Sequence, residues 1–216
     1  SRAPAAPSIT NNQEAGVDEG DIVKAIGDTL VILRRGRLFT VETRGGALRA
    51  VDRINAYPPG VDGSEGWYDE MLVAENWIVV IGYSYGRGGT EINRFRLGAN
   101  GRMTFVDSHL LKSGDYYSSR NYAGRLVGRE LVTYAPIGVR GGNPLGVLPG
   151  LVRWAEGRGD AGFSGPPAAI MEASDVYRAV DPETKPRGWD TLHTVIRCDL
   201  TAPQLQCRGA AVLGPY

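Results

Sequence analysis

The chain has 216 residues, which is long enough to bury a core of its own. Its 24 basic residues balance 24 acidic ones, so it has no net charge with which to attract nucleic acid, and none is expected as a partner. The longest apolar runs fall far short of the roughly 20 residues of a membrane helix, so no membrane span is expected. The 30 Gly and 13 Pro residues make a turn-rich composition that favours many short strands.

The chain opens with a segment rich in Ala and Pro. Residues 1–14 begin Ser-Arg-Ala-Pro-Ala-Ala-Pro and lack an apolar stretch, so we expect an N-terminal linker here. The remaining residues, 15–216, are predicted to form one partial propeller domain, for the reasons that follow.

Three segments share the pattern of a strand, a two-residue turn and a second strand. They are residues 21–33, 69–81 and 122–134, with turns at Gly27-Asp28, Glu75-Asn76 and Gly128-Arg129. Small or short polar residues tolerate the positive φ that such hairpin turns require. After each of the first two hairpins the sequence predicts another pair of strands, connected by a turn that contains Gly.

Four short strands per unit, repeated along the chain, are typical of propeller blades. We therefore predict an all-β, propeller-like fold with about three four-stranded antiparallel blades, at residues 17–57, 67–112 and 115–214. A Gly- and Pro-rich insertion, residues 140–188, interrupts the third blade, and two short helices are expected in it near 148–156 and 166–177. Because propellers close with about four to eight blades, this is a partial propeller.

An open propeller leaves two blade faces without a neighbour. Apolar side chains such as Ile22, Ile26 and Leu213 would then contact water. Since large exposed apolar faces are rare on monomers, we expect the chain to self-associate through contacts that mimic the packing of a further blade.

The only two cysteines lie in the last predicted pair of strands. Cys198 and Cys207 are placed symmetrically about Ala202 and Pro203. A hairpin that turns there would bring the two residues directly opposite each other, at a distance that allows a disulfide. A disulfide is favoured over two buried thiols, because the count is even and the hairpin symmetric.

The residues before the first hairpin carry a family resemblance. Residues 10–24 read Thr-Asn-Asn-Gln-Glu-Ala-Gly-Val-Asp-Glu-Gly-Asp-Ile-Val-Lys, which resembles the opening of a family of secreted proteins with a C-terminal β-propeller domain, distantly related to WD repeats. Residues 173–177 and 194–200 are also similar to that family. The resemblance implies a secreted, extracytoplasmic bacterial or archaeal propeller, in the periplasm or at the cell surface. It brings no catalytic residues, and the family's domain is longer than this chain.

An acidic cluster, Asp18, Glu19 and Asp21, precedes the first strand. Three carboxylates in four positions are a candidate Ca²⁺ site, since Ca²⁺ takes several oxygen ligands. The alternative is a loop whose Asp side chains accept hydrogen bonds from backbone N–H groups. This alternative is favoured, because the spacing of the carboxylates does not match that of a calcium-binding loop. Lys24 follows in the first strand and is a candidate ion-pair partner for Asp18 or Asp21. No other cofactor is predicted.

Aromatic residues are concentrated in the middle of the chain and form a candidate binding surface. They are Trp67, Tyr68, Tyr83, Tyr85, Tyr116 and Tyr117. Tyr and Trp combine broad apolar faces with polar groups, so a cluster at blade loops favours a protein or carbohydrate ligand. The alternative is that the same residues pack between blades.

Two classes of function remain open. The sequence contains no nucleophile elbow and no phosphate-binding loop, and its two histidines, His109 and His193, lack neighbours for a zinc site. An extracytoplasmic interaction module is therefore the favoured function. The alternative is a propeller hydrolase, lyase or oxidoreductase whose site is completed by blades absent from this chain.

Overall fold

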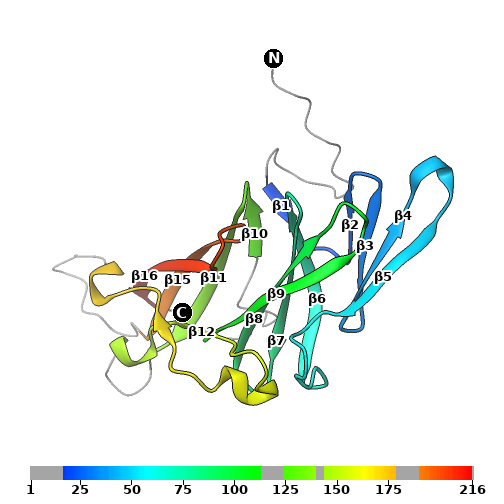
Figure 1. The fold of residues 1–216 in the computed structure, drawn as a ribbon. Helices are drawn as coiled ribbons and strands as arrows, with labels where there is room; N and C mark the ends of the chain where they lie inside the picture. The colour runs from blue at the N-terminus through cyan, green and yellow to red at the C-terminus, as the bar shows by residue number, and fades with distance from the viewer. Residues whose placement is uncertain (1–16, 113–123, 140–143, 179–189, 216) are drawn as a thin grey trace.

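The computed structural model describes residues 17–112, 124–139, 144–178 and 190–215. It consists of three twisted sheets, named A, B and C, which stand side by side like neighbouring blades with sheet B in the middle (Figure 1). The prediction of an all-β fold built mainly from antiparallel strands is confirmed. In the described ranges, no helix has the length and hydropathy needed to cross a membrane.

Sheet C has four antiparallel strands in chain order. They are β2 (Val23–Ile26), β3 (Thr29–Arg34), β4 (Arg37–Glu42) and β5 (Arg49–Asn55). Alternate residues of β3 and β4, such as Val31, Leu33 and Leu38, are buried against sheet B. The turn between β4 and β5 contains a short 3-10 helix, η1 (Arg44–Gly46).

Sheet B has six strands and is covered on both faces. Its strands are β6 (Gly66–Ala74), β7 (Trp77–Ser84), β8 (Gly89–Leu97), β9 (Met103–Leu111), β12 (Gly150–Arg153) and β13 (Ala168–Ala169). Most residues of β7 and β8 are buried whichever way they point. One apolar cluster joins the sheet to sheet C through Ile78 and Phe95, and another joins it to sheet A through Val79 and Ile196.

Sheet A also has six strands, including the first of the chain. In spatial order they are β1 (Val17–Glu19), β10 (Gly124–Val127), β11 (Glu130–Gly138), β15 (Thr191–Asp199), β16 (Gln206–Gly214) and β14 (Val176–Arg178). All neighbours are antiparallel except β14 and β16, which are parallel.

The three predicted two-residue hairpin turns are confirmed. The register closes each hairpin immediately around its turn, with Ile26 opposite Thr29, Ala74 opposite Trp77 and Val127 opposite Glu130. The first turn residues, Gly27, Glu75 and Gly128, have φ values of 56°, 56° and 65°. Positive φ at this position matches the turn to the twist of the flanking strands.

The prediction of two short helices in the insertion is wrong. Residues 150–153 form β12, which pairs with the edge of β9, and the helical pieces are short 3-10 segments. They are η2 (Pro144–Val147), η3 (Gly159–Phe163) and η4 (Ala173–Asp175). Gly and Pro leave runs too short for a stable α-helix, whereas the open edge of β9 offers backbone partners to an extended segment.

The start of the chain crosses from one sheet to the next instead of staying in the first blade. Residues 17–19, expected in that blade, form β1 and pair with β10 of sheet A. The backbone of Asp21 then exchanges two hydrogen bonds of 3.1 Å with Met71 of sheet B, and β2 begins sheet C. We call residues 17–24 the N-terminal strap, because this segment includes or contacts a strand at the edge of each of the three sheets.

The β15–β16 hairpin carries the predicted disulfide. Cys198 lies directly opposite Cys207 with their Cα atoms 4.1 Å apart, and the two sulfurs are bonded. A disulfide is typical of proteins from an oxidising compartment.

We expect reduction of this disulfide to loosen one hairpin and leave the fold intact. The bond closes a loop with a sequence separation of 9, for which chain entropy predicts a stabilisation of about 2–3 kcal/mol. Thermal unfolding with and without reductant measures the difference, and mass analysis without reduction checks the linkage. Free thiols after oxidising preparation would contradict it.

A buried arginine joins this hairpin to sheet B. The Arg94 guanidinium makes two hydrogen bonds to the Asp107 carboxylate, of 2.7 and 2.5 Å. It also donates to three carbonyl oxygens of the hairpin turn, those of Leu200, Ala202 and Pro203, at 3.1, 2.6 and 3.4 Å. Because one fully buried side chain connects two sheets, it fixes how sheets A and B pack.

Candidate functional site

The aromatic residues of sheet B separate onto its two faces. Trp67 lies opposite Tyr83 on the neighbouring strand, and Tyr85 follows two positions later on the same face. Trp67 and Tyr85 are exposed to 59% and 62%. Tyr68 points the other way and is buried. Tyr68 therefore packs in the interior, whereas Trp67 and Tyr85 remain candidates for a binding surface.

The exposed aromatic side chains line a pocket at one end of sheet B. The pocket has a volume of about 440 Å³, and its lining residues are Ser64, Glu65, Gly66, Trp67, Tyr85 and Gly86. We call it the aromatic pocket. The two expected members Tyr116 and Tyr117 lie outside the described residues.

Local contacts hold the rings of the aromatic pocket in place. The Trp67 indole N–H donates to the Asp69 carboxylate at 3.1 Å, and Tyr85 packs edge-on against Tyr83 with ring centres 5.1 Å apart. The backbone N–H of Tyr85 donates to the carbonyl of Glu65 at 3.3 Å, which continues the β6–β7 pairing into the pocket. The site therefore lies where β6 begins and β7 ends, in turns that the strand pairing holds in place.

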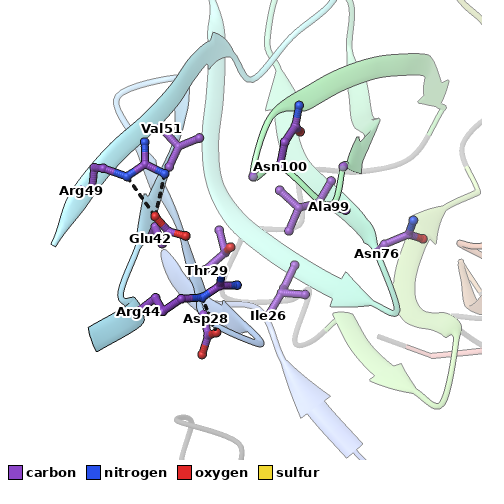
Figure 2. A pocket seen from close by; sticks show the side chains of 13 residues that line it. Ile26, Asp28, Thr29, Glu42, Arg44, Arg49, Val51, Asn76, Ala99 and Asn100 are labelled. Carbon is purple, nitrogen blue, oxygen red and sulfur yellow. Dashed lines mark hydrogen bonds and ion pairs between the residues drawn. The ribbon is translucent and has the colours of Figure 1, made fainter. Parts of the chain in front are cut away.

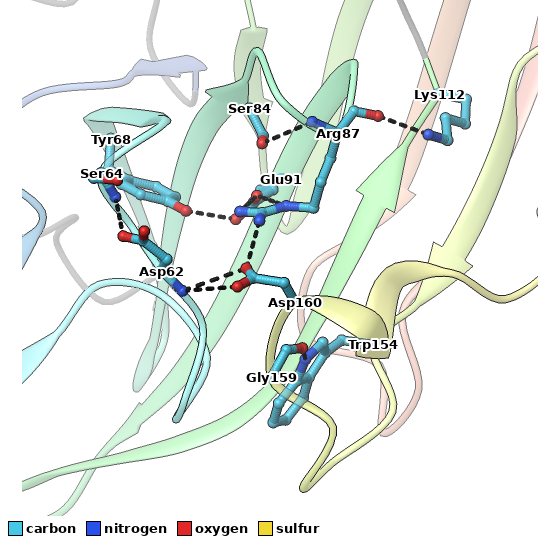
Figure 3. A network of polar contacts seen from close by, with 10 residues as sticks. All are labelled: Asp62, Ser64, Tyr68, Ser84, Arg87, Glu91, Lys112, Trp154, Gly159 and Asp160. Atoms are coloured by element: carbon cyan, nitrogen blue, oxygen red, sulfur yellow. Dashed lines mark hydrogen bonds and ion pairs between the residues drawn. The ribbon is translucent and has the colours of Figure 1, made fainter.

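A network of polar contacts surrounds the buried Glu91 (Figure 3). Glu91 is fully buried. Its carboxylate accepts hydrogen bonds from the Tyr68 hydroxyl at 2.7 Å and from the Arg87 Nε–H at 2.9 Å. Burial, reinforced by the Glu91 charge, raises the pKa of Tyr68 far above its usual range, so the phenol stays a hydrogen-bond donor. Both carboxylate oxygens are thus occupied, which makes Glu91 a structural group.

Arg87 extends this network to the insertion. Its guanidinium donates to the Asp160 carboxylate at 2.8 Å and lies 4.9 Å from the centre of the Phe163 ring, both in η3. Burial lowers the pKa of Arg87, but the Glu91 charge outweighs it and raises the pKa overall, so the side chain stays a cation. The turn that carries Tyr85 is thereby fixed to the insertion as well as to sheet B.

The acidic cluster of the N-terminal strap is engaged in internal bonds. The Asp18 carboxylate pairs with the buried Lys24 amine at 2.8 Å, as one of the sequence alternatives predicts. The Asp21 carboxylate accepts the neighbouring backbone N–H of Ile22 at 2.6 Å, and the side chain of Glu19 lies outside what the structure describes. No group of three His, Cys, Asp or Glu in the described ranges is arranged to hold a metal ion.

The two histidines lie on different strands of different sheets. Burial lowers the pKa of His109 to about 4, so its ring is neutral at pH 7. His193 bonds the Tyr134 hydroxyl through Nδ1 at 2.7 Å and the carbonyl of Pro215 through Nε2 at 2.9 Å. Because only a protonated Nε2 can donate to a carbonyl, Nδ1 accepts from Tyr134 in the neutral ring.

A larger cavity, of about 590 Å³, separates the ends of sheets C and B (Figure 2). Its charged side chains neutralise each other: Arg49 makes hydrogen bonds of 2.9 and 2.6 Å to Glu42, and Arg44 lies 3.3 Å from Asp28. A third cavity, of about 620 Å³ beside Cys207, is lined by Arg129 and Glu130, which pair with Asp199 and Arg197. The described residues that line these two cavities include no aromatic ring.

The sequence prediction missed four residues that line the aromatic pocket, Ser64, Glu65, Gly66 and Gly86, of which Glu65 could have been found. The signal was the period-two pattern Glu65-x-Trp67 facing Tyr83-x-Tyr85, which places Glu65 and Tyr85 at neighbouring positions on one face. Density of aromatic residues alone could not separate this face from the face of Tyr68.

Comparison with known proteins finds a similarity in the N-terminal part of the chain. No curated protein and no solved structure matches the chain. A family model does match, over a range that contains all of sheet C and strands β6–β9 of sheet B. Residues 7–113 of this chain match the family described as the beta propeller domain.

Proposed function

We propose that the chain is an extracytoplasmic propeller module that binds its ligand through the aromatic pocket and catalyses no reaction. The observation that carries the proposal is the pair Trp67 and Tyr85, two large side chains more than half exposed at a pocket that paired strands hold in shape. Exposed Trp and Tyr are the residues that most often dominate binding energy at interfaces. The disulfide supports an oxidising, extracytoplasmic compartment.

The test is a ligand screen that uses variants of the aromatic pocket. We expect the chain to bind members of a mixed glycan and peptide array, and Trp67→Ala or Tyr85→Ala to weaken that binding about tenfold or more, since a lost anchor residue costs about 1.4 kcal/mol or more. Tyr177→Ala is the matched control, because Tyr177 is 60% exposed but lies on sheet A. Binding that survives both pocket variants would contradict the proposal.

We also propose that the chain self-associates, with a second copy packing against the uncovered sheet faces. Ile22 is 51% exposed, as expected, and Val195 and Val212 of sheet A are exposed to 44% and 51%. Ile26 and Leu213, also expected to be exposed, are partly buried against apolar clusters. Uncovered apolar sheet faces favour association.

Sedimentation velocity should therefore show association that increases with concentration. The double variant Val195→Lys/Val212→Lys should shift the equilibrium toward monomer, because lysines on an interface face must be desolvated. Val106→Lys, at a residue of β9 that is 39% exposed, is the control. A strictly monomeric wild-type chain at high concentration would refute this proposal.

A further inference from the structure

We propose that the aromatic pocket binds a positively charged ammonium group, such as a quaternary ammonium or the end of a lysine side chain. This inference rests on the proposed function and names the chemistry of the ligand. It follows from the charge of the pocket and from the orientation of its rings.

Among the described residues that line the pocket, one side chain is charged, and it is acidic. Glu65 is exposed, and its carboxylate lies over the backbone of Gly86: a Cβ added to Gly86 would sit 2.1 Å from the Glu65 Oε2. Among the described residues, no cation pairs with this carboxylate. The nearby Arg87 is held by Glu91 and Asp160. An anionic ligand would therefore meet repulsion, and a cation would gain a partner.

The aromatic rings add to the preference for a cation. The face of an aromatic ring is electron-rich, and Trp binds cations best of the three aromatic residues. The Asp69 carboxylate accepts a hydrogen bond from the Trp67 indole N–H, which fixes the ring. Tyr85 is braced edge-on by Tyr83. Trp67, Tyr85 and Glu65 thus bring two aromatic side chains and one acidic side chain to the same pocket.

Another tryptophan of this protein, Trp77, already contacts cationic side chains. Two guanidinium groups lie over the buried Trp77 ring, with Arg94 at 4.7 Å and Arg96 at 3.8 Å from its centre. There the chain supplies its own cations. At the aromatic pocket, the described lining residues include no Lys or Arg, so a cationic ligand would meet no positive charge among them.

The test compares two compounds of the same shape that differ in charge. Calorimetric titration of the full chain with choline and with neutral 3,3-dimethyl-1-butanol should show choline binding about tenfold more tightly, from cation–π and carboxylate attraction together. Glu65→Gln should weaken choline binding about fivefold to tenfold and leave the neutral compound unchanged within twofold. Trp67→Leu should abolish the binding of choline. Equal melting temperatures of both variants and wild type confirm that the fold is kept.

Two results would overturn the inference. One is equal affinity for choline and its neutral isostere, or choline binding that Glu65→Gln does not change. The other is no binding of choline or of Nα-acetyl-lysine methylamide. In either case the proposed function stands if array ligands still depend on Trp67, and it fails as well if none of them does.

Discussion

Replacing Arg94 by Met should lower the free energy of unfolding by about 3–5 kcal/mol. The Asp107 carboxylate would stay buried without its bidentate partner, and the turn carbonyls of Leu200, Ala202 and Pro203 would lose their donor. Breaking a buried ion pair from one side costs this much because a charge remains in a medium that cannot solvate it. For a chain of this size, the melting temperature should fall by about 10 °C or more.

Arg96→Met is the matched control for this result. Arg96 also lies over the Trp77 ring and donates a hydrogen bond to Asn76, but it is partly exposed, so its loss should cost less than about 1 kcal/mol. The double variant Arg94→Met/Asp107→Leu should recover most of the lost stability, because it removes both charges together. If Arg94→Met costs no more than Arg96→Met, Arg94 does not hold sheets A and B together.

Replacing Glu91 by Gln should cost about 3 kcal/mol, although the two side chains have nearly the same shape. The amide has one acceptor oxygen where the carboxylate has two, so either Tyr68 or Arg87 would lose its acceptor in a buried place. Arg87 would also hold the turn 85–88 less firmly. Amide hydrogen exchange should therefore accelerate in that turn, and binding at the aromatic pocket should weaken.

Glu65→Gln makes the same chemical change at an exposed position. It should alter the stability by less than about 0.5 kcal/mol, because Glu65 is solvated and makes no ion pair with the described residues. Comparison of the two variants separates two roles: Glu91→Gln tests whether Glu91 supports the pocket, and Glu65→Gln tests whether Glu65 contacts a ligand directly. An effect of Glu91→Gln as small as that of Glu65→Gln would mean that the network is not structural.

Features that depend on neighbouring residues, such as the hairpin turns and the disulfide, were predictable from the sequence. Gly27, Glu75 and Gly128 adopt the backbone that a two-residue hairpin requires, and Cys198 faces Cys207 because the turn is symmetric. These features depend on a few neighbouring residues, so composition and spacing are sufficient to find them.

Features that depend on distant segments were not predictable in this way. Strand β1 pairs with a strand more than a hundred residues away, and β12 was expected to be helical because an open edge of β9 cannot be seen in the sequence. Glu91 and Arg94 look like solvent-facing polar positions of a strand, yet both are fully buried because sheet B is covered on both faces. The partners Arg87, Tyr68 and Asp107 become visible only once the strands are paired.

The measurement that tests the binding module most directly is a titration followed by the indole N–H signals of ¹⁵N-labelled tryptophan. The chain has four Trp residues, and the buried Trp77 and Trp154 serve as internal references beside the exposed Trp67. With choline, or with any ligand found on the array, we expect the Trp67 signal to shift in a saturable way while the signals of Trp77 and Trp154 stay in place. A ligand that binds without moving the Trp67 signal would contradict a binding function at the aromatic pocket.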